Sequence, residues 1–549
     1  MKNKLLLGFL LYCYTASAQQ WLWSYPVHSD GASQIMNVAT DSSGNGYVMG
    51  GISGHSNFFG LNDSIAVDDV NSFISKFDRY GNLGWVSGAR GNFGMNNNPM
   101  NGGFALDNAG NSYLTGSFHD TAWFGNNSDT IQTVAPGNSK GILVKLDSDG
   151  KAVYAKQYND PKHRGIIIGA TPSGELVHSG YYSIPADTNF ACYLKKSEAA
   201  TGNDLWTLPG NATLIATVGS AIVPTNDGGF LLNAAYGYDS TVFHGMHSSV
   251  NIPATAGWHD VYMVKYSLSG EVLWGKKVGG VEYDWCRGIT VDGDNNIIFA
   301  VESRSAASYD GIPLLPKGER TLHLIKTDPS GNYVNHISFN AGTYMHFWLN
   351  DLKSDRHGNI YLCAKMDTTQ IIGSDTLFYN SDPLNQRISI MKFDAGMNYL
   401  WSQYMSGYCN CGGSISVADS IIYFAMNHDG SVSLNGTGYT YTAPTLTHTS
   451  FVAGLRNSEL TTKTDEKVKE TTFAVYPNPG TGLFTIEVNG EPGSGSQLQV
   501  FDMMGNCVQQ SSATLEKTLL LNLERLPKGV YFVELKASRG IAVKKVVLQ

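Results

Sequence analysis

Few residues in this chain combine the types and the spacing that catalysis requires. Gly137-Asn138-Ser139-Lys140-Gly141 fits the Gly-x-Ser-x-Gly pattern, in which a nucleophilic serine sits on a sharp turn from a strand to a helix. We expect this segment to be a loop that precedes a strand, which offers the serine no such turn. The sequence contains no His-Glu-x-x-His, P-loop or dinucleotide-binding pattern. We therefore predict no catalytic residue, no cofactor and no cofactor-binding residue.

Candidate metal ligands occur mostly where turns are expected. Asp147–Gly150 and Asp292–Asn295 cluster the oxygen ligands that calcium prefers, but Asp, Asn and Gly are also the usual residues of tight turns. Cys409-Asn410-Cys411 would provide two zinc ligands, and no second Cys or His pair follows at ligand spacing. We predict no metal site, while calcium binding stays open. The six cysteines after Cys13 are expected to be buried or paired, in an order that sequence does not reveal.

The composition predicts a globular, all-β protein. Hydrophobic residues make up 42% of the 549 positions and charged residues 15%, which is typical of a folded chain. Turn-forming Gly (61 residues) accompanies many aromatic residues (29 Tyr and 23 Phe), as expected for strands joined by turns. The net charge is −9 and no basic face is evident, which argues against nucleic acid as a partner.

A unit of strand, tight turn and strand recurs along most of the chain. Its clearest copy is Asp260–Trp274, with the turn at Leu268-Ser269-Gly270. A similar pair, such as Val38–Gly50, precedes each copy, so one unit holds four short strands. One lysine recurs in each of the first six units, with Gly five residues after it in four of them. The repeated lysines are Lys76, Lys145, Lys195, Lys265, Lys326 and Lys392. Constant strands with variable loops, stacked around an axis, are the β-propeller solution.

The last unit lacks its fourth strand, and the start of the chain provides a replacement. After Leu455 the sequence turns polar, while Trp21-Leu22-Trp23-Ser24 is a strand with no partner nearby. We expect this N-terminal strand to complete the last blade and close the ring. The repeats, of the form D-x-x-G-N-x-Y followed by F-x-x-K-x-D-x-x-G-x-x-x-W, resemble the seven-bladed propeller repeats of exported bacterial proteins. That resemblance covers roughly residues 20–456 and implies seven four-stranded blades without naming a function.

Residues 1–18 have the physics of a signal peptide. Lys2 and Lys4 precede the short apolar run Leu5–Leu11, and Ala16-Ser17-Ala18 is a small-residue cleavage site whose key positions are Ala16 and Ala18. The alternative, a lipoprotein anchored at Cys13, requires a small residue where Tyr12 stands. No other apolar run is long enough for a transmembrane helix. We expect export of a chain without a transmembrane segment.

The end of the chain is expected to be a separate small domain. Residues 457–471 are polar and charged and predict a linker, which leaves 19–456 for the propeller. Residues 472–549 alternate like short strands, which predicts an Ig-like sandwich. This tail resembles the C-terminal sorting domain of the type IX secretion system of Bacteroidetes. The motif residues are Tyr476, Pro477, Asn478, Pro479, Gly529, Lys544 and Lys545. The resemblance implies recognition by that machinery and either release or attachment at the cell surface.

Three roles remain open for the propeller. The scaffold has variable insertions between the second and third strands of its units, such as Phe59–Ile65, Phe124–Ile131 and Ile372–Leu377, and loops on a rigid scaffold are frequent binding sites. We therefore expect a non-catalytic binding module for a glycan or a surface protein. The alternative is a polysaccharide hydrolase or lyase with paired carboxylates from different blades. A purely structural surface component is a third possibility.

Overall fold

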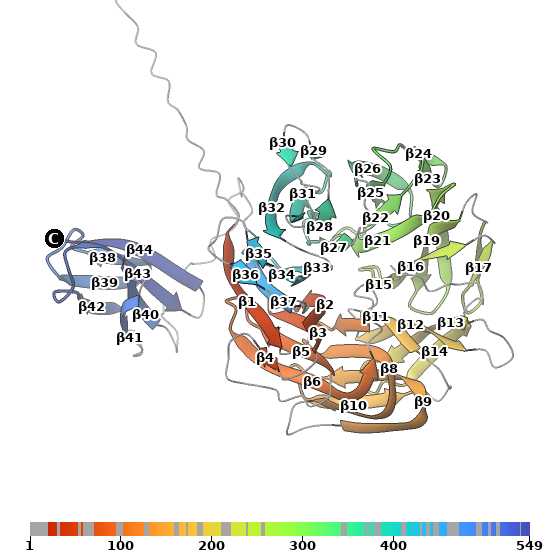
Figure 1. Cartoon of the computed structure of the whole chain (residues 1–549), viewed down its shortest axis with the longest axis horizontal. Helices are drawn as coiled ribbons and strands as arrows, with labels where there is room; N and C mark the ends of the chain where they lie inside the picture. The colour runs from red at the N-terminus through yellow and green to blue at the C-terminus, as the bar shows by residue number, and fades with distance from the viewer. Residues whose placement is uncertain are drawn as a thin grey trace, which may run out of the picture. The chain divides into compact units, whose positions relative to one another are not determined.

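The computed structural model divides the chain into two compact units, Met1–Ser458 and Glu459–Gln549. It describes residues 20–29, 33–52, 56–58, 71–94, 103–125, 131–158, 164–171, 174–183, 190–209, 221–237, 240–253, 258–341, 349–366, 370–372, 375–377, 386–407, 413–428, 431–434, 440–442, 449–457, 472–489, 497–502, 507–511, 517–537 and 540–549. All regular elements in these ranges are β-strands, so the all-β prediction is confirmed (Figure 1). The predicted cleavage residues Ala16 and Ala18 lie outside them.

The first unit is built from sets of four consecutive antiparallel strands. Two sets stand alone as sheets: β11 (Arg164–Ala170), β12 (Glu175–Ser183), β13 (Phe190–Glu198) and β14 (Asp204–Pro209), and then β21 (Asp284–Val291), β22 (Ile297–Ser303), β25 (Thr321–Thr327) and β26 (Tyr333–Asn340). Two sets have an added hairpin: β15 (Ala221–Pro224), β16 (Gly229–Gly237), β19 (His259–Ser267) and β20 (Val272–Gly280), and β27 (Leu349–Ser354), β28 (Ile360–Met366), β31 (Gln386–Phe393) and β32 (Tyr399–Gly407).

Two further sets share one larger sheet. They are β2 (Ser33–Thr40), β3 (Gly46–Ile52), β5 (Asn71–Phe77) and β6 (Leu83–Gly94), and β7 (Gly103–Leu106), β8 (Ser112–Gly125), β9 (Ile131–Leu146) and β10 (Ala152–Gln157). The last set contains β33 (Gly413–Val417), β34 (Ile421–His428) and β37 (Thr449–Arg456). The first strands of successive sets contact one another, from β2 through β7, β11, β15, β21, β27 and β33 back to β2. Figure 1 shows the sheets arranged around this common middle.

The N-terminal strand completes the last set, as expected. β1 (Trp21–Ser29) pairs antiparallel with β37, with Trp23 opposite Gly454. Asn457 follows β37 and is buried, although the sequence analysis places it in the linker. Its side-chain oxygen accepts from the Tyr361 hydroxyl at 3.0 Å and from Lys392 Nζ at 3.4 Å. Asn457 therefore belongs to the first unit.

Most of the repeated motif residues hold the turns together. At one end of the sheets, which we call the turn end, Asp41 accepts from the backbone N–H groups of Ser43 and Asn45 at 2.9 Å. Its second oxygen accepts from the Asn45 side chain at 2.8 Å and from the Tyr47 hydroxyl at 3.2 Å. Asp107 and Asp355 make the same bonds. These Asp, Asn and Tyr side chains are used by the fold itself.

Neighbouring sets of strands are joined at the turn end by a lysine and an aromatic ring. Lys76 Nζ donates to the carbonyl of Ser148, in the third-to-fourth-strand turn of the next set, at 3.2 Å. Trp85 Nε1 donates to the same carbonyl at 2.9 Å and packs on Gly150, whose φ is +80°. A Cβ on Gly150 would lie 2.6 Å from the indole, so glycine is required there.

The structure corrects one of the repeated lysines. In the third set, Lys196 rather than Lys195 donates to the turn carbonyl of the next set, Leu268, at 3.1 Å. Lys196 also lies opposite Trp206, just as Lys76 lies opposite Trp85. The turn from Glu198 to Gly202 is one residue longer than its counterparts, which displaces the lysine by one position relative to the glycine.

Several insertions between second and third strands cover a neighbouring sheet edge. β4 (Ser56–Phe58) pairs with β1, β23 (Ala307–Tyr309) pairs with β20, and β35 (Ser431–Leu434) pairs with β32. β24 (Ile312–Leu314) and β36 (Thr440–Thr442) complete the last two hairpins. Separate hairpins are formed by β17 (Thr241–His244) with β18 (Ser249–Ile252), and by β29 (Gln370–Ile372) with β30 (Asp375–Leu377). Pairing of an outer strand removes an exposed edge. These insertions therefore protect sheet edges, a role that was not predicted from the sequence.

The second unit consists of two sheets around one apolar core. The first has the order β38 (Thr472–Tyr476), β39 (Leu483–Asn489) and β42 (Thr518–Asn522). The second has the order β41 (Cys507–Ser511), β40 (Gln497–Phe501), β43 (Gly529–Ala537) and β44 (Gly540–Leu548). Phe484, Ile486, Val500 and Val533 from both sheets share the core. This is the expected two-sheet arrangement; its Ig-like topology stays a prediction.

Replacement of Trp23 tests the contribution of the N-terminal strand. Trp23 is 6% exposed and lies against Gly81 and Gly454. We expect Trp23→Ala to lower the stability of the first unit by roughly 3–5 kcal/mol, because the indole leaves a cavity. Thermal unfolding measures this, with Leu22→Ala as the control, since Leu22 is 36% exposed on the same strand. Equal losses in the two variants would contradict the assigned packing.

Candidate binding site

A row of aromatic rings lies at the end of the sheets opposite the turn end, which we call the loop end. Trp258 stacks on Tyr283 with ring centroids 5.4 Å apart, and Tyr283 stacks on Trp285 at 5.6 Å with an interplanar angle of 8°. Trp258 precedes β19, whereas Tyr283 and Trp285 lie at the start of β21, so two neighbouring sheets contribute. Trp258 is 48% exposed, and Tyr283 and Trp285 are partly buried. We call these three rings the aromatic row.

Arginine side chains surround the far end of this row. The Arg304 guanidinium lies 4.9 Å from the Trp285 ring centre and 5.9 Å from that of Tyr283. Arg287 lies 5.5 Å from the Trp285 ring. Cations are attracted to the electron-rich faces of such rings, so the arginines and rings stabilise one another.

A buried glutamate fixes two of the neighbouring arginines. Glu302 is fully buried, and its two oxygens are bound at 2.6 Å by Arg287 Nη2 and at 2.9 Å by Arg320 Nη1. A buried carboxylate requires such partners, because desolvation of an unpaired charge is costly. Both Glu302 oxygens are therefore occupied by arginine.

Two further carboxyl groups are buried below the aromatic row. Asp284 is 0% exposed, and its Oδ2 accepts from the Gly280 N–H at 2.8 Å. Burial, together with the charges of Asp260, Glu302 and Glu282, raises the pKa of Asp284 to about 8. Asp260 is 1% exposed, and burial raises its pKa although Lys277 Nζ lies 3.3 Å away. A Cβ on Gly279 would lie 2.0 Å from Asp260 Oδ1, so glycine is needed beside this carboxyl group.

The backbone explains why these side chains converge. Trp285 lies opposite Glu302 in the β21–β22 pair, which places them on one face of the sheet. The register shifts between Cys286 and Gly288, so Arg287 is the extra residue of a bulge, and bulges re-aim side chains. The first strands β2 and β27 have the same irregularity. The scaffold thus repeats this bulge and varies the side chain that it carries.

A second polar cluster contains Ser, His and Asp but not in catalytic order. His178 Nε2 lies 2.9 Å from Ser197 Oγ, which donates to Asp204 Oδ1 at 3.0 Å. In a catalytic triad the histidine lies between serine and aspartate, whereas here the serine lies between the other two. His178 and Ser197 are both fully buried. The three residues lie on neighbouring strands of one sheet, β12, β13 and β14, and satisfy one another's polar groups there.

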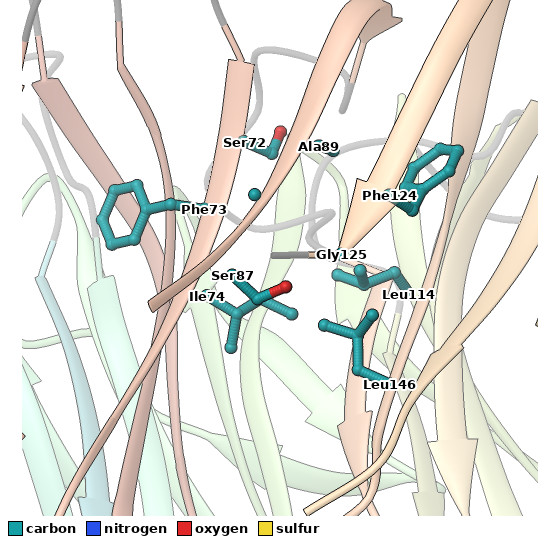
Figure 2. Close-up of a pocket in the computed structure, with 10 residues that line it drawn as sticks. Ser72, Phe73, Ile74, Ser87, Ala89, Leu114, Phe124, Gly125 and Leu146 are labelled. Atoms are coloured by element: carbon teal, nitrogen blue, oxygen red, sulfur yellow. The ribbon is translucent and has the colours of Figure 1, made fainter. Parts of the chain in front are cut away.

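The cavity in Figure 2 is too small for an organic ligand. It lies between β5, β6 and β8 and is lined mainly by apolar side chains such as Ile74, Leu114 and Phe124. Its volume is about 10 Å³, near the minimum of roughly 10–15 Å³ that one water molecule needs. Ser87 Oγ lines it and has no hydrogen-bond partner within the described part of the chain. This site suits at most a water molecule.

The structure brings the predicted sorting residues together, although they come from distant parts of the tail. Asn478 Nδ2 donates to the Lys545 carbonyl at 2.6 Å, and the Val547 N–H donates to Asn478 Oδ1 at 2.9 Å. Gly529 starts β43 and pairs with Leu548 of the terminal strand β44. The Tyr-Pro-Asn-Pro segment therefore holds the last strand in place.

The remaining motif residues are presented to solvent. Pro477, Pro479, Lys544 and Lys545 are exposed, and Tyr476 is 46% exposed with its hydroxyl 3.0 Å from Glu487. They form part of the surface of the second unit.

The other sequence candidates have structural or undescribed positions. Gly137–Gly141 lies within strand β9 rather than in a loop, so it has no strand-to-helix turn. Asp147 and Asp292 each accept backbone N–H groups of their own turn. Cys286 is buried, and Cys409 and Cys411 lie outside the described residues.

The aromatic row and its arginines were not predicted from the sequence. One signal was present, because Tyr283, Trp285 and Arg287 recur every second residue, the spacing of one strand face. Trp258 and Arg304 come from separate segments, and no local pattern links them to β21.

Residues 474–549 match the family model of the secretion system C-terminal sorting domain. The domain indicates export by type IX secretion, so the protein is secreted or anchored at the cell surface. No curated protein matches the sequence. Among the described residues no helix has the length and apolar character to cross a membrane.

Solved structures with similar folds share little sequence with this chain. Acylaminoacyl peptidase of Pyrococcus horikoshii is 9% identical with a TM-score of 0.35, over 84% of this chain and 58% of the peptidase. A puromycin hydrolase is 10% identical with a TM-score of 0.39, over 83% and 58%. The calcium-binding protein regucalcin of Agrobacterium tumefaciens is 12% identical with a TM-score of 0.28, over 67% and 94%. The chain thus spans less than two thirds of the two hydrolases.

The raised pKa of Asp284 predicts a pH-dependent stability. The folded state holds the Asp284 proton more tightly than the unfolded state does. The stability that the protonated carboxyl group contributes is therefore fully present below the unfolded pKa and is lost as the pH rises towards about 8. Asp284→Asn keeps an acceptor for Gly280 and cannot ionise. We expect Asp284→Asn to gain stability relative to the natural protein as the pH rises from 5 to 8, by up to roughly 1.4 kcal/mol per pH unit. Melting temperatures of the two proteins across this range measure the difference. A constant difference across this range would contradict the assignment.

The Asn478 bonds predict a local effect on the terminal strand. We expect Asn478→Ala to cost roughly 1–2 kcal/mol and to speed amide exchange at Val547, because two hydrogen bonds are lost. Asn478→Asp keeps the acceptor for Val547 and should protect that amide better. Hydrogen exchange of the intact chain measures both, and equal exchange in all three proteins would refute the clamp.

Proposed function

We propose that residues 19–456 form a seven-bladed β-propeller that acts as a non-catalytic binding module at or outside the cell surface. The cyclic contacts among β2, β7, β11, β15, β21, β27 and β33 support the propeller. The pairing of β1 with β37 supports closure of the ring by the N-terminal strand. Each blade then buries its sheet faces against its neighbours.

The proposed route of export uses both ends of the chain. Residues 1–18 act as a signal peptide, with cleavage after Ala18, as in the sequence analysis. The sorting domain then directs passage across the outer membrane, and the polar segment after Asn457 is the place where the tail is removed. In the resembling family this route is typical of Bacteroidetes.

The observation that carries the binding proposal is the contrast between accessible rings and inaccessible carboxyl groups. Trp258 is 48% exposed at the head of the aromatic row, whereas Asp260, Asp284 and Glu302 are at most 1% exposed. Exposed, preorganised aromatic residues are typical anchors of binding sites. A general acid or base must reach the substrate, and these carboxyl groups are enclosed.

One feature favours the alternative of a polysaccharide hydrolase or lyase. Asp284, with a pKa of about 8, keeps its proton at neutral pH, as a general acid must. Its burial and its bond to the Gly280 N–H speak for a structural role instead.

Retention and product release measured together separate the two functions. We expect the intact protein to be retained by one member of a panel of polysaccharides and surface proteins without releasing sugars. Trp258→Ala should lose that retention, while Trp123→Ala should keep it, because Trp123 is 37% exposed but lies outside the aromatic row. Released sugars that disappear in Asp284→Asn would replace the binding function with catalysis.

A further inference from the structure

We propose that the aromatic row and Arg304 bind an acidic polysaccharide, with a uronate carboxylate on Arg304 and a sugar ring against the exposed Trp258. This proposal rests on the binding function above and specifies its ligand. Trp258 and Tyr283 come from neighbouring sheets, so the row bridges two sheets at the loop end.

The rings are held in a fixed orientation because they stack on one another. Tyr283 and Trp285 are almost parallel, at 8°, and Trp258 is inclined to Tyr283 by 21°. The face of an aromatic ring is electronegative and attracts the weakly positive C–H hydrogens on the apolar face of a sugar ring. Because Tyr283 stacks on both Trp258 and Trp285, the surface offered to a sugar ring is that of Trp258, which is 48% exposed.

Arg304 is a cation without an acidic partner at this site. Glu302 is taken by Arg287 and Arg320, and the Asp260 carboxyl lies beside Lys277. Within the described ranges no carboxylate forms an ion pair with Arg304, and its buried Nε has no hydrogen-bond partner. A guanidinium prefers a planar anion that accepts two hydrogen bonds, which a carboxylate does.

The charge of Arg304 therefore favours an anionic ligand, although the chain as a whole has a net charge of −9. Elsewhere the acidic surface repels polyanions, so binding depends on this local arginine. Among ligands that combine a carboxylate with stackable ring faces, a uronate polysaccharide satisfies both halves of the site.

Polygalacturonate and its methyl ester form a matched pair of ligands for the intact protein. They share the sugar backbone, and esterification removes the carboxylate charge. By calorimetry we expect the free acid to bind roughly 10- to 100-fold more tightly than the ester, the range for hydrogen bonds to a charged group. Arg304→Gln should abolish that preference, and Arg304→Lys should restore part of it, since the charge returns without the planar fork.

Two controls keep the result specific. Arg79→Gln removes the same charge at the exposed turn end, where Arg79 donates to the Ser43 carbonyl, and should leave binding unchanged. Trp258→Ala should weaken both ligands, because stacking does not depend on the carboxylate. Melting temperatures confirm that each variant is folded.

Equal affinity for acid and ester, no binding of either, or equal losses in Arg304→Gln and Arg79→Gln would overturn this proposal. Retention on neutral polysaccharides or proteins that depends on Trp258 would leave the binding function standing while the acidic ligand fails. If no member of the panel retained the protein in a way that depends on Trp258, both the acidic ligand and the binding function would be refuted.

Discussion

The first unit depends on one contact that is repeated between neighbouring sets of strands. A lysine and an aromatic ring from one set of strands reach the carbonyl and the glycine of a turn in the next set. Lys76 and Trp85 both donate to the Ser148 carbonyl, and the indole lies flat on Gly150. This contact uses a positive charge, a ring and a left-handed glycine together, so each of the three constrains the other two. It explains why these residues recur at constant spacing while the loops vary.

Because this contact lies at the turn end, the side chains at the two ends of the sheets of the first unit have different roles. At the turn end, the recurring Asp, Asn, Tyr and Lys side chains have their hydrogen-bonding capacity taken up by the turns. The loop end is less constrained by the repeat, and there a bulge in β21 carries Arg287 towards Glu302. The candidate site lies where several first strands share the same backbone bulge but carry different side chains on it.

Sequence reasoning succeeded where the information is local. The strand, turn and strand of Asp260–Trp274 follow from residues within reach of one another, and β19 and β20 confirm them. The pairing of Trp21–Ser24 with the last set was also predictable, because an incomplete unit and an unpartnered strand imply each other. Lys195 was assigned wrongly because one extra turn residue is invisible to a fixed spacing. The aromatic row was missed because Trp258, Tyr283 and Arg304 approach only after two sheets pack. The number of blades remains a prediction.

The position of Asn457 has a consequence for the order in which the chain folds. In other sets the lysine bonds to a backbone carbonyl of the following turn, but Lys392 bonds to the Asn457 side chain. The last set has no such turn, because its fourth strand comes from the beginning of the chain. β1 therefore pairs with a strand from which more than 400 residues separate it, since Trp23 lies opposite Gly454. Contacts between such distant segments form slowly, so completion of the first unit is a late event in folding. Any chain that has emerged only as far as β34 still lacks β37, so β1 has no partner strand from the last set.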